Sequence, residues 1–539
     1  MAKYMAKYIA KGMTKSMTSR TTIRPHEYHD SVRLMQVSEQ LRKLDGVDEA
    51  ILMMATDNNK KLLAAAGFAG KEVADAARDD LVIGIVAGNE TIADAALAKA
   101  LELLRSQARR LQAGEHRSLE TAMAALQGAN LALISVPGEY AAEETQKALE
   151  NGLHVMLFSD NVPVGEEARL KQIADTRGLL LMGPDCGTAI INGRGLGFAN
   201  AVDRGAVGIV GASGTGIQEI SVQLHRRGIG VSHAIGTGGR DLKSAIGGRS
   251  MLRGIDMLAA DAATEVLVLT SKPPDEDVAE CVLDKAAGCG KPVVVNFLGA
   301  GVEPDARPGL VAADTLSGAA LEAAKLLRRA QDPAAGPSRS DDELRRLAER
   351  EARLLSPTQS CLRGLYTGGT LCHEAMLVLR DYVGPVYSNI ALEPDYILSD
   401  PSHSRANTLI DMGDDRFTQG RAHPMIDPEQ RNRRLENEAD DPGVAVVLLD
   451  LVLGYGSHEN PAATLAESVR AAKARAADAG RHLAVIASVC GTERDPQDLA
   501  RQENLLTDTG VLLAASNAEA GRLAGLVVAA AAGRRTGRS

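Results

Sequence analysis

Apolar and polar positions along residues 131–299 follow the pattern of strands separated by helices. Segments with helical spacing lie between six apolar runs, which read LALISVP (131–137), HVMLFSD (154–160), LLLMGPD (179–185), AVGIVGA (206–212), EVLVLTSK (265–272) and PVVVNFLG (292–299). Strands interleaved with helices in this way predict βαβ units and parallel sheets. The break after Met182 and the new start at Gly205 indicate two separate sheets.

A third α/β unit follows a polar linker. Residues 331–342 are rich in Pro, Gly and Asp, and a charged helical segment comes next, so we assign 331–355 to a linker and helix. Residues 356–530 then form a flavodoxin-like domain. Its expected strands are CLRGLYT, GPVYSN, TLIDMGD, VAVVLLDLVLG, LAVIASVCG and VLLAAS.

The N-terminal part of the chain has a different pattern. Two apolar strands alternate with three helical segments between Tyr28 and Arg110, which predicts a ferredoxin-like α+β domain over 25–110. Residues 1–24 are rich in Lys and lack the apolar stretch of a secretory signal, so we expect a disordered extension there. The fold class is therefore α/β, with several Rossmann-like or flavodoxin-like parallel-sheet domains and a small N-terminal α+β domain.

Composition narrows the function. Of the 539 residues, 45% are hydrophobic and 24% charged, as in a globular protein. The net charge of -10 argues against a general nucleic-acid binder, and no apolar stretch reaches the ~20 residues that span a bilayer. The six cysteines form no Cys-x-x-Cys pair, so we expect a cytoplasmic protein without disulfides or a metal site.

The sharpest chemical signal is a Gly-rich loop between a strand and a helix. The strand VGIVGA leads directly into Ser213, Gly214, Thr215 and Gly216, and a helical segment follows. Glycines let the backbone approach a ligand, and the free N–H groups and dipole at a helix start attract anions. We expect these four residues to bind phosphate, with the two hydroxyl groups as additional donors.

The third unit contains a second loop of this kind. The strand LLDLVLG leads into Gly454, Gly456 and Ser457, and a helix begins near Pro461. We expect these three residues to bind the same phosphate from the opposite side, so that two helix starts share one anion. His458, next in the chain, is a candidate general acid–base or phosphate ligand.

Further candidates lie in loops and at strand ends, where open α/β sheets bind ligands. Candidate substrate-binding residues are Gly183, Asp185, Gly238, Gly239 and Arg240. Candidate catalytic residues, besides His458, are Arg421, His423, Glu493 and Arg494. Arg binds phosphate and carboxylate groups, and His and Glu exchange protons, but each also fits a role in ion pairs or loop caps. We expect Cys186 to pack in the core, because no His or Lys lies near it in the sequence.

Several of these segments resemble the succinyl-CoA synthetase superfamily. GPDCGTAIINGRG resembles a turn in the CoA-binding domain of the synthetase α-subunit, and GIVGASGTGIQE resembles the phosphate-facing helix of its ligase domain. VLLDLVLGYGSHENPAATL resembles the C-terminal ligase domain of the β-subunit. The resemblance implies a CoA-binding-like Rossmann domain over 111–204 and ligase-like flavodoxin domains over 205–330 and 356–530.

A closer resemblance is to the FdrA family. It is carried by SDNVP, LLLMGPDCGT, GASGTGIQE, HAIGTGGRDL, LYTGGTL, GRAHPMIDP and GTERDPQ. This resemblance implies a carbamoyltransferase subunit that interconverts oxalurate plus phosphate with oxamate plus carbamoyl phosphate in allantoin breakdown. It also implies a hetero-oligomer with other carbamoyltransferase subunits or a homodimer. The net charge and the short apolar runs lead us to expect neither nucleic acid nor a membrane as a partner.

The chain departs from the synthetase pattern in two ways. The segment at the position of the relay histidine reads GAGVEPDARPGLVAAD, and no histidine lies between His233 and His373. The ATP-grasp domain and the Gly-rich loop of the CoA domain are also missing, so CoA is retained only as an alternative ligand. Two other functions therefore stay open: an acyl-CoA synthetase with a partner that supplies ATP-grasp, and a non-catalytic scaffold subunit.

Overall fold

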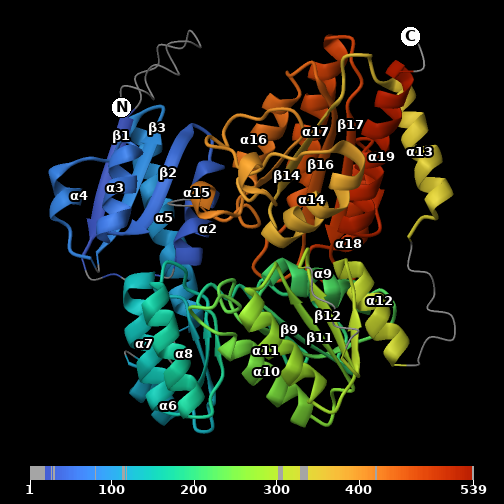
Figure 1. The fold of residues 1–539 in the computed structure, drawn as a ribbon. Helices are drawn as coiled ribbons and strands as arrows, with labels where there is room; N and C mark the ends of the chain where they lie inside the picture. Colours follow the sequence, from blue (N-terminus) through green and yellow to red (C-terminus); the bar gives the residue numbers. More distant parts are fainter. Residues whose placement is uncertain are drawn as a thin grey trace. The chain divides into compact units, whose positions relative to one another are not determined.

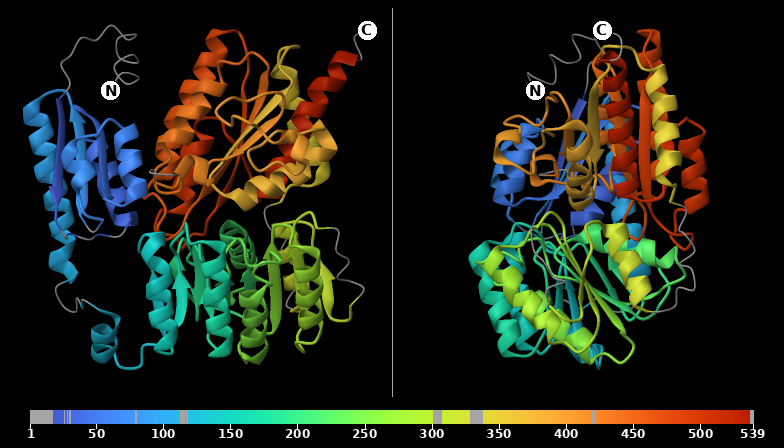
Figure 2. Two further views of the ribbon diagram at one scale, coloured as in Figure 1. Left: turned by 60° about the vertical axis from the view of Figure 1, so that its left-hand side comes forward. Right: turned by 45° about the vertical axis from the view of Figure 1, so that its right-hand side comes forward.

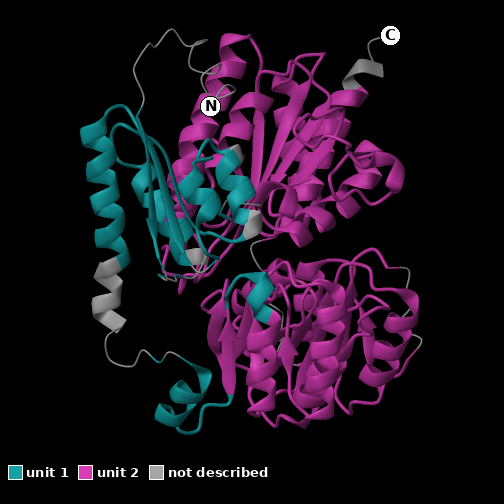
Figure 3. Ribbon diagram, turned by 90° about the vertical axis from the view of Figure 1, so that its left-hand side faces the viewer, with its two compact units in different colours: residues 1–130, 135–141, 419–422 teal, residues 131–134, 142–418, 423–539 magenta. Residues whose placement is uncertain are grey.

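The computed structural model describes residues 18–25, 27, 29, 31–78, 80–111, 116, 118–300, 307–327, 338–418 and 422–536. The chain divides into two compact units (Figure 3), of which the first comprises residues 1–130, 135–141 and 419–422 and the second the remainder. Within the described ranges, no helix combines the length and apolar character needed to cross a bilayer.

The first unit contains an antiparallel sheet with helices on both faces (Figure 1). Its strands, in the order β1-β3-β2, are β1 (Thr18–Arg24), β2 (Val47–Met54) and β3 (Leu81–Ala87). Its helices are α2 (Ser31–Arg42), α3 (Asp57–Ala65), α4 (Lys71–Asp75), α5 (Glu90–Leu111) and α6 (Leu119–Ala125). Helices α2 and α5 share one apolar core with the sheet, and a smaller core around Phe68 lies with α3 and α4 on the other face. The predicted small N-terminal α+β domain is confirmed.

Strand β1 corrects the expectation that residues 1–24 form a disordered extension. Thr18–Arg24 pairs with β3 over its whole length, from Thr18 opposite Ala87 to Arg24 opposite Leu81. Its threonines and isoleucine favour an extended strand, and Ile23 packs against the core around Phe68. The Lys-rich sequence before this strand led to the expectation of a disordered extension. Residues 1–17 lie outside the described residues.

The second unit begins with a short parallel sheet, followed by a seven-stranded one. The first sheet contains β4 (Leu131–Ile134), β5 (His154–Leu157) and β6 (Leu181–Met182), and its region includes α7 (Gly138–Glu150) and α8 (Val164–Thr176). The second has the order β13-β12-β11-β9-β10-β7-β8. Its strands are β7 (Thr188–Ile191), β8 (Arg194–Gly197), β9 (Val207–Gly211), β10 (Val231–Gly236), β11 (Val266–Ser271), β12 (Val293–Phe297) and β13 (Leu310–Ala312). The antiparallel β7–β8 hairpin joins the second sheet through β10, a connection that the sequence pattern did not predict.

Helices cover both faces of the seven-stranded sheet (Figures 1 and 2). The helices of one face are α9 (Gly214–His225) and α12 (Leu316–Leu326), and those of the other are α10 (Arg249–Ala260) and α11 (Glu276–Ala287). Strands β9 to β12 are almost fully buried, as expected of a parallel sheet covered on both faces.

The last part of the second unit is a parallel sheet with the order β15-β14-β16-β17-β18. Its strands are β14 (Cys361–Tyr366), β15 (Thr408–Asp411), β16 (Val444–Val452), β17 (Ala484–Cys490) and β18 (Leu512–Ala514). One face is covered by α13 (Asp341–Leu354), α14 (Gly369–Val383) and α19 (Asn517–Thr536). The other is covered by α16 (Glu429–Glu438), α17 (Pro461–Asp478) and α18 (Leu499–Thr507). The connection between α14 and β15 includes η2 (Pro394–Tyr396), and α15 (Asp415–Thr418) follows β15. The predicted α/β fold with several parallel sheets is confirmed.

The segment GPVYSN is not a strand of this sheet, contrary to the sequence prediction. Only Tyr387 and Ser388 form isolated bridges, with Thr408 and Ile397. Gly384 has a φ of +69° and Pro385 follows it, so the backbone turns away after α14 rather than continuing as an extended strand.

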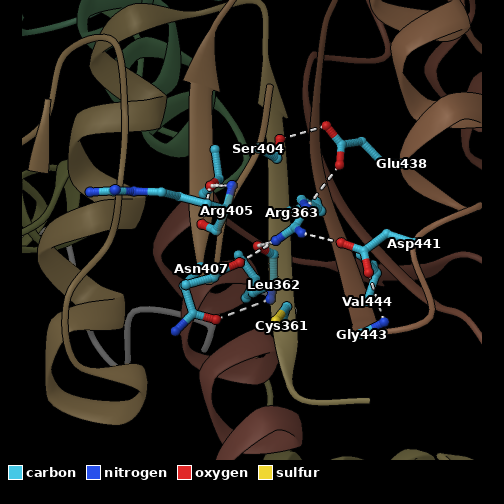
Figure 4. Close-up of polar contacts among 12 residues, drawn as sticks. Cys361, Leu362, Arg363, Ser404, Arg405, Asn407, Glu438, Asp441, Gly443 and Val444 are labelled. Carbon is cyan, nitrogen blue, oxygen red and sulfur yellow. Dashed lines mark hydrogen bonds and ion pairs between the residues drawn. The ribbon is translucent and has the colours of Figure 1, made fainter. Parts of the chain in front are cut away.

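Arg363, in the middle of β14, anchors the long connection between α14 and β15 (Figure 4). Its buried guanidinium pairs with Glu438 at 2.8 Å and Asp441 at 2.6 Å, and it donates to the Ala406 carbonyl. Ser404 donates to the same Glu438 carboxylate at 2.5 Å. A buried charge with this many partners is costly to disturb, so the network fixes the connection that leads into β15.

Asn200 joins the seven-stranded and five-stranded parts of the second unit. Its buried side chain donates to Asp495 Oδ2 at 2.8 Å and to the Leu453 carbonyl at 3.1 Å, and it accepts from Gln218 of α9 at 3.1 Å. Asp495 also accepts the Ala201 N–H at 2.7 Å. An apolar core built from α9, α12, α14 and α19 runs between the same two sheets.

Candidate functional site

The start of α9 has the anion-binding features that the sequence predicted. Ser213 is the N-cap: its Oγ accepts the Gly216 N–H at 2.9 Å, and its carbonyl accepts the Ile217 N–H. Among the described residues, the N–H groups of Gly214 and Thr215 and the Thr215 hydroxyl have no hydrogen-bond partner. The dipole of this twelve-residue helix adds roughly half a positive charge at this end.

The helix start that faces α9 is that of α14. The Ser213 hydroxyl donates to Thr370 Oγ1 at 2.7 Å, so it positions α14 and is not the free phosphate donor that we expected. Thr215 lies against the same helix start, because a Cβ on Gly368 would be 2.8 Å from Thr215 Cγ2. α14 has no side-chain cap, so its first N–H groups are also orphaned.

A buried carboxylate holds the loop before α14. Asp450 of β16 accepts the Thr367 N–H and the Gly368 N–H, both at 2.8 Å, and the Thr367 hydroxyl at 2.9 Å. Arg431 of α16 lies 3.5 Å from the same carboxylate and is also buried. Burial raises the pKa of Asp450, while Arg431 and the three hydrogen bonds lower it. Asp450 therefore determines where α14 begins.

Three polar side chains converge beside the start of α14. A Cβ on Gly369 would lie 2.4 Å from Asp411 Oδ2 and 3.3 Å from Lys272 Nζ. A Cβ on Gly413 would lie 2.7 Å from His423 Nε2 and 3.2 Å from Asp411 Oδ1. In the ranges that the structure describes, the half-buried Lys272 ammonium has no hydrogen bond or ion pair. An unpaired cation beside the start of α14 suits an anionic ligand.

We call this arrangement the α9–α14 cradle, defined by Gly214, Thr215, Gly369, Thr370 and Lys272. Burial raises the pKa of the adjacent Asp411 to about 6, although the charge of Lys272 lowers it. Burial lowers the pKa of His423 to about 4, so its ring is neutral at pH 7. The cradle thus combines backbone donors and one cation, and the adjacent Asp411 adds a carboxylate with a raised pKa.

The second predicted phosphate loop is bonded to other parts of the chain instead. The Gly454 N–H donates to Gln497 at 3.1 Å, and the Tyr455 N–H donates to the Ala199 carbonyl at 2.8 Å. α17 begins at Pro461, which has no N–H, and the N–H of the next residue donates to Gln502 at 2.9 Å. These contacts argue against α17 as the second half of an anion site.

The remainder of this loop lies against Phe198. A Cβ on Gly456 would be 3.0 Å from the Phe198 ring, whose centroid is 5.9 Å from that of His423. The Ser457 hydroxyl is buried without a hydrogen-bond partner among the described residues. His458 is buried, and its Nδ1 accepts the Asn460 N–H at 3.0 Å, which fits a loop cap.

The candidate substrate-binding residues gather at neighbouring strand ends. A Cβ on Gly238 would be 2.3 Å from the Pro184 carbonyl and 3.0 Å from Gly183 Cα, so these two loops touch. Arg240 pairs with the buried Glu167 at 2.9 Å, whereas Gly239 borders open space. Near them, Asp185 is exposed, while the surrounding protein and the carboxylates of Asp160 and Asp415 raise its pKa.

Cys186 packs in the core, as the sequence predicted. It is 2% exposed, and its thiol donates to the Gly236 carbonyl at 3.3 Å. Burial raises the pKa of this thiol to about 12, which leaves almost no thiolate at pH 7. Arg421, another candidate, lies outside the described residues.

Glu493 and Arg494 form ion pairs with the region around α9. Glu493 lies 2.7 Å from His225 Nε2, and Arg494 lies 2.6 Å from Asp203. Both side chains are mostly exposed, whereas the His225 side chain is buried. These positions fit a structural role, in which the two residues attach the loop after β17 to the region around α9, better than the catalytic role that we predicted.

Glu493→Gln should therefore change little. The Glu493 carboxylate is mostly exposed, and a glutamine amide can still hydrogen-bond His225, so we expect urea unfolding to shift by no more than about 1 kcal/mol. Turnover should stay within about twofold of the wild type, since the side chain is bonded away from the cradle. A fall in turnover by two orders of magnitude, with unchanged stability, would restore Glu493 as a catalytic residue.

Sequence reasoning missed Lys272, Asp411, Asp450 and Thr370. Asp450 had a readable signal, because a single carboxylate inside the apolar run LLDLVLG needs a buried partner. LYTGGTL likewise has the strand–glycine–helix order that marked the Ser213 loop. Lys272 follows β11 and Asp411 is the last residue of β15, and only the fold brings them together.

Parts of the chain match three described families. Residues 203–299 match the CoA binding domain, residues 365–527 match the CoA-ligase family, and residues 17–121 match the domain described as AllF, heavy metal-associated domain. Together with the parallel sheets and the cradle, these matches define a protein of the succinyl-CoA synthetase-like superfamily.

The chain belongs to the family of the uncharacterized protein YahF of Escherichia coli (strain K12), an FdrA-like family. It is 46% identical to YahF over 514 residues, which cover 94% of this chain and 98% of YahF. It is also 29% identical over 208 residues to the succinate–CoA ligase [ADP-forming] subunit alpha of Aquifex aeolicus (strain VF5). That match covers 37% of this chain and 66% of the subunit.

Solved structures give weaker likeness. The ATP citrate lyase from Methanothrix soehngenii, in complex with citrate and coenzyme A, has a TM-score of 0.34 and 13% identity, covering 78% of this chain and 86% of the lyase. A dinucleotide-forming acetyl-coenzyme A synthetase from Ca. Korarchaeum cryptofilum, in complex with phosphate and ADP, has a TM-score of 0.28 and 15% identity, covering 75% and 83%. Scores this low say nothing about substrates.

The match of the N-terminal region to a heavy metal-associated domain raises the question of a metal. Soft metals are typically bound by cysteine thiolates, yet the chain has no cysteine before Cys186. Across the described residues, no group of three His, Cys, Asp or Glu side chains could hold an ion. The residues present do not fit a thiolate-bound metal, and no step proposed below involves one.

Proposed function

We propose that the chain is the acyl-transfer component of a CoA-ligase-type enzyme. In this proposal, the α9–α14 cradle binds an acyl phosphate, and the acyl group moves between phosphate and a second substrate. The observation that carries the proposal is a pair of facing helix starts: among the described residues, the N–H groups of Gly214 and Thr215 have no partner, and unpaired Lys272 Nζ lies near Gly369 at the start of α14.

The cradle suits the charges that develop in this reaction. When a nucleophile attacks the acyl carbon, the carbon–oxygen bond to phosphate breaks and negative charge grows on the departing phosphate. Fixed N–H donors and a nearby cation stabilise that charge without reorganising, and one such donor is typically worth ~2.7–4 kcal/mol. No covalent intermediate on the protein is required.

Coenzyme A is the second substrate that the family favours. The matches to the CoA-ligase family and to a succinate–CoA ligase α-subunit support a thiol acceptor. An ATP-dependent reaction would then need a partner chain that supplies the ATP-grasp domain. We place the complex in the cytoplasm, where the six free cysteines stay reduced.

Carbamoyl transfer is the second candidate. Here phosphate and oxalurate would exchange with carbamoyl phosphate and oxamate, and carbamoyl phosphate would occupy the cradle. The absence of histidine between His233 and His373 favours this candidate, because a synthetase-type relay at that position has no histidine to carry the phosphoryl group. Direct transfer from an acyl phosphate needs no relay.

One assay separates these functions. The full chain, purified alone and with its co-purifying partners, is incubated with oxalurate and phosphate, and separately with ATP, CoA and a carboxylic acid. Carbamoyl phosphate formed without CoA or ATP identifies carbamoyl transfer, whereas CoA-dependent formation of ADP identifies the ligase. Unchanged activity of the partners without this chain would leave it a scaffold subunit and overturn the proposal.

We expect no stable phosphohistidine on this chain. Burial lowers the pKa of His373, the first histidine after the gap, to about 4, and its ring lies 3.4 Å from the Leu298 carbonyl. After incubation with ATP or carbamoyl phosphate, ³¹P NMR should show no acid-labile phosphoramidate signal. Such a signal, mapped by mass spectrometry to His458 or His423, would contradict direct transfer.

A further inference from the structure

We propose that Asp411 exchanges the proton of the acceptor during acyl transfer. This inference rests on the function proposed above, and it adds the residue that handles the proton. A thiol or an amide N–H must lose its proton when it attacks an acyl carbon, so the cradle needs a base as well as anion donors.

The structure holds the Asp411 carboxylate in one orientation. Its Oδ1 accepts the Gly413 N–H at 2.9 Å. The Asp411 N–H donates to Asn389 Oδ1 at 3.0 Å, and the Asp411 carbonyl accepts from Asn389 Nδ2 at 2.9 Å. Among the described residues, Oδ2 has no hydrogen-bond donor. It lies against Gly369, where Lys272 Nζ also points. The free oxygen is therefore the one that faces the start of α14.

Neighbouring groups are poorer bases. The Asp450 carboxylate already accepts three hydrogen bonds and faces Arg431. His423 Nδ1 accepts the Met425 N–H at 3.3 Å, and burial lowers the pKa of this ring to about 4. Burial raises the pKa of Asp411 to about 6, which lies close to the working pH of a cytoplasmic enzyme.

The step balances without another reactant. The acceptor atom forms a bond to the acyl carbon while the carbon–oxygen bond to phosphate breaks, and phosphate leaves with that electron pair. The acceptor proton passes to Asp411 Oδ2. In the reverse direction, Asp411 returns the proton to the departing thiol or amide as phosphate attacks.

The charges around Asp411 determine its pH dependence. Lys272, which follows β11, lowers the pKa of Asp411. Asp414, in the loop after β15, and Asp450 of β16 raise it. The neutral His423 adds no charge. Below about pH 6 the carboxyl is protonated, so forward transfer should fall as pH decreases. Lys272→Met removes the lowering charge and should move this fall to higher pH, a shift that a purely structural role of Asp411 would not produce.

The test uses the full chain and two readouts. We expect Asp411→Asn to lower turnover by ~10²-fold or more at pH 7.5 and to remove the acidic limb of the pH profile. The control is Asp508→Asn at the C-cap of α18, which should keep the wild-type turnover and the acidic limb of the pH profile. An acidic limb that persists in Asp411→Asn and disappears in Asp185→Asn would overturn the inference.

Calorimetry with sulfate, which does not titrate in this range, gives a readout without turnover. At pH 6, sulfate bound beside Asp411 should raise the pKa of this carboxyl, so the protein should take up roughly 0.3–0.5 proton per sulfate. The difference in binding enthalpy between two buffers measures this proton uptake. Asp411→Asn should bind sulfate without this uptake. Equal proton uptake by the wild type and Asp411→Asn would overturn the proton-transfer role of Asp411 and leave the proposed function untouched. Wild-type protein that binds neither sulfate nor phosphate would overturn the proposed function.

Discussion

Gly214→Val should abolish productive phosphate binding while leaving the fold intact. Gly214 is the first residue of α9, it is exposed, and a Cβ there would already lie 3.3 Å from Thr188 Oγ1. The branched side chain would fill the space that a phosphoryl oxygen needs to reach the N–H groups of Gly214 and Thr215. We expect phosphate affinity to fall by at least ~100-fold, or about 2.7 kcal/mol.

The matched control is Gly165→Val. Gly165 also lies in the first turn of a helix, α8, and a Cβ there meets no atom of the described residues within 4 Å. Phosphate affinity, measured by calorimetry, should stay at the wild-type value in this variant, and both proteins should show similar thermal unfolding. If Gly214→Val keeps phosphate affinity within about threefold, the start of α9 is a tight corner and not an anion site.

Asp450→Asn should destabilise the protein by ~3–5 kcal/mol, because it leaves the buried Arg431 without its counter-charge. An asparagine has a single side-chain oxygen, so it cannot accept all three hydrogen bonds that Thr367 and Gly368 donate to Asp450. The start of α14 should therefore be less well ordered. Urea unfolding measures the loss of stability, and sulfate affinity measures the state of the cradle.

The double variant Asp450→Asn/Arg431→Met separates charge from hydrogen bonding. Methionine removes the uncompensated cation, so much of the lost stability should return. Sulfate affinity should stay low, because the Thr367 and Gly368 N–H groups still lack their full acceptor. Recovery of both properties together would show that Asp450 serves only to neutralise Arg431.

The sequence was sufficient for most of the parallel strands, because a strand buried on both faces must be continuously apolar. The runs at 206–212, 265–272 and 292–299 contain β9, β11 and β12, and the Ser213 loop follows β9 as expected. Local pattern succeeded here because the determining feature, burial or a helix start, extends over adjacent residues.

Local pattern failed where pairing between distant residues decides the outcome. β1 is mostly polar, and its pairing with β3 over seven residues identifies it as a strand. The loop before α17 matched the expected pattern, but Gln497 accepts the Gly454 N–H of that loop and Gln502 accepts the Ala462 N–H in the first turn of α17. Lys272 follows β11 of one sheet and Asp411 ends β15 of another, so no spacing in the sequence could place them together.

The two parts of the second unit, which Asn200 joins, lie in one polypeptide, and this determines how the cradle is assembled. The α9 half and the α14 half of the cradle belong to one polypeptide, whereas the Aquifex relative is named as a separate subunit alpha. Covalent connection replaces a bimolecular encounter by an effective concentration on the order of millimolar. Assembly of the cradle should therefore be independent of dilution, and any concentration dependence of activity would report the binding of another chain.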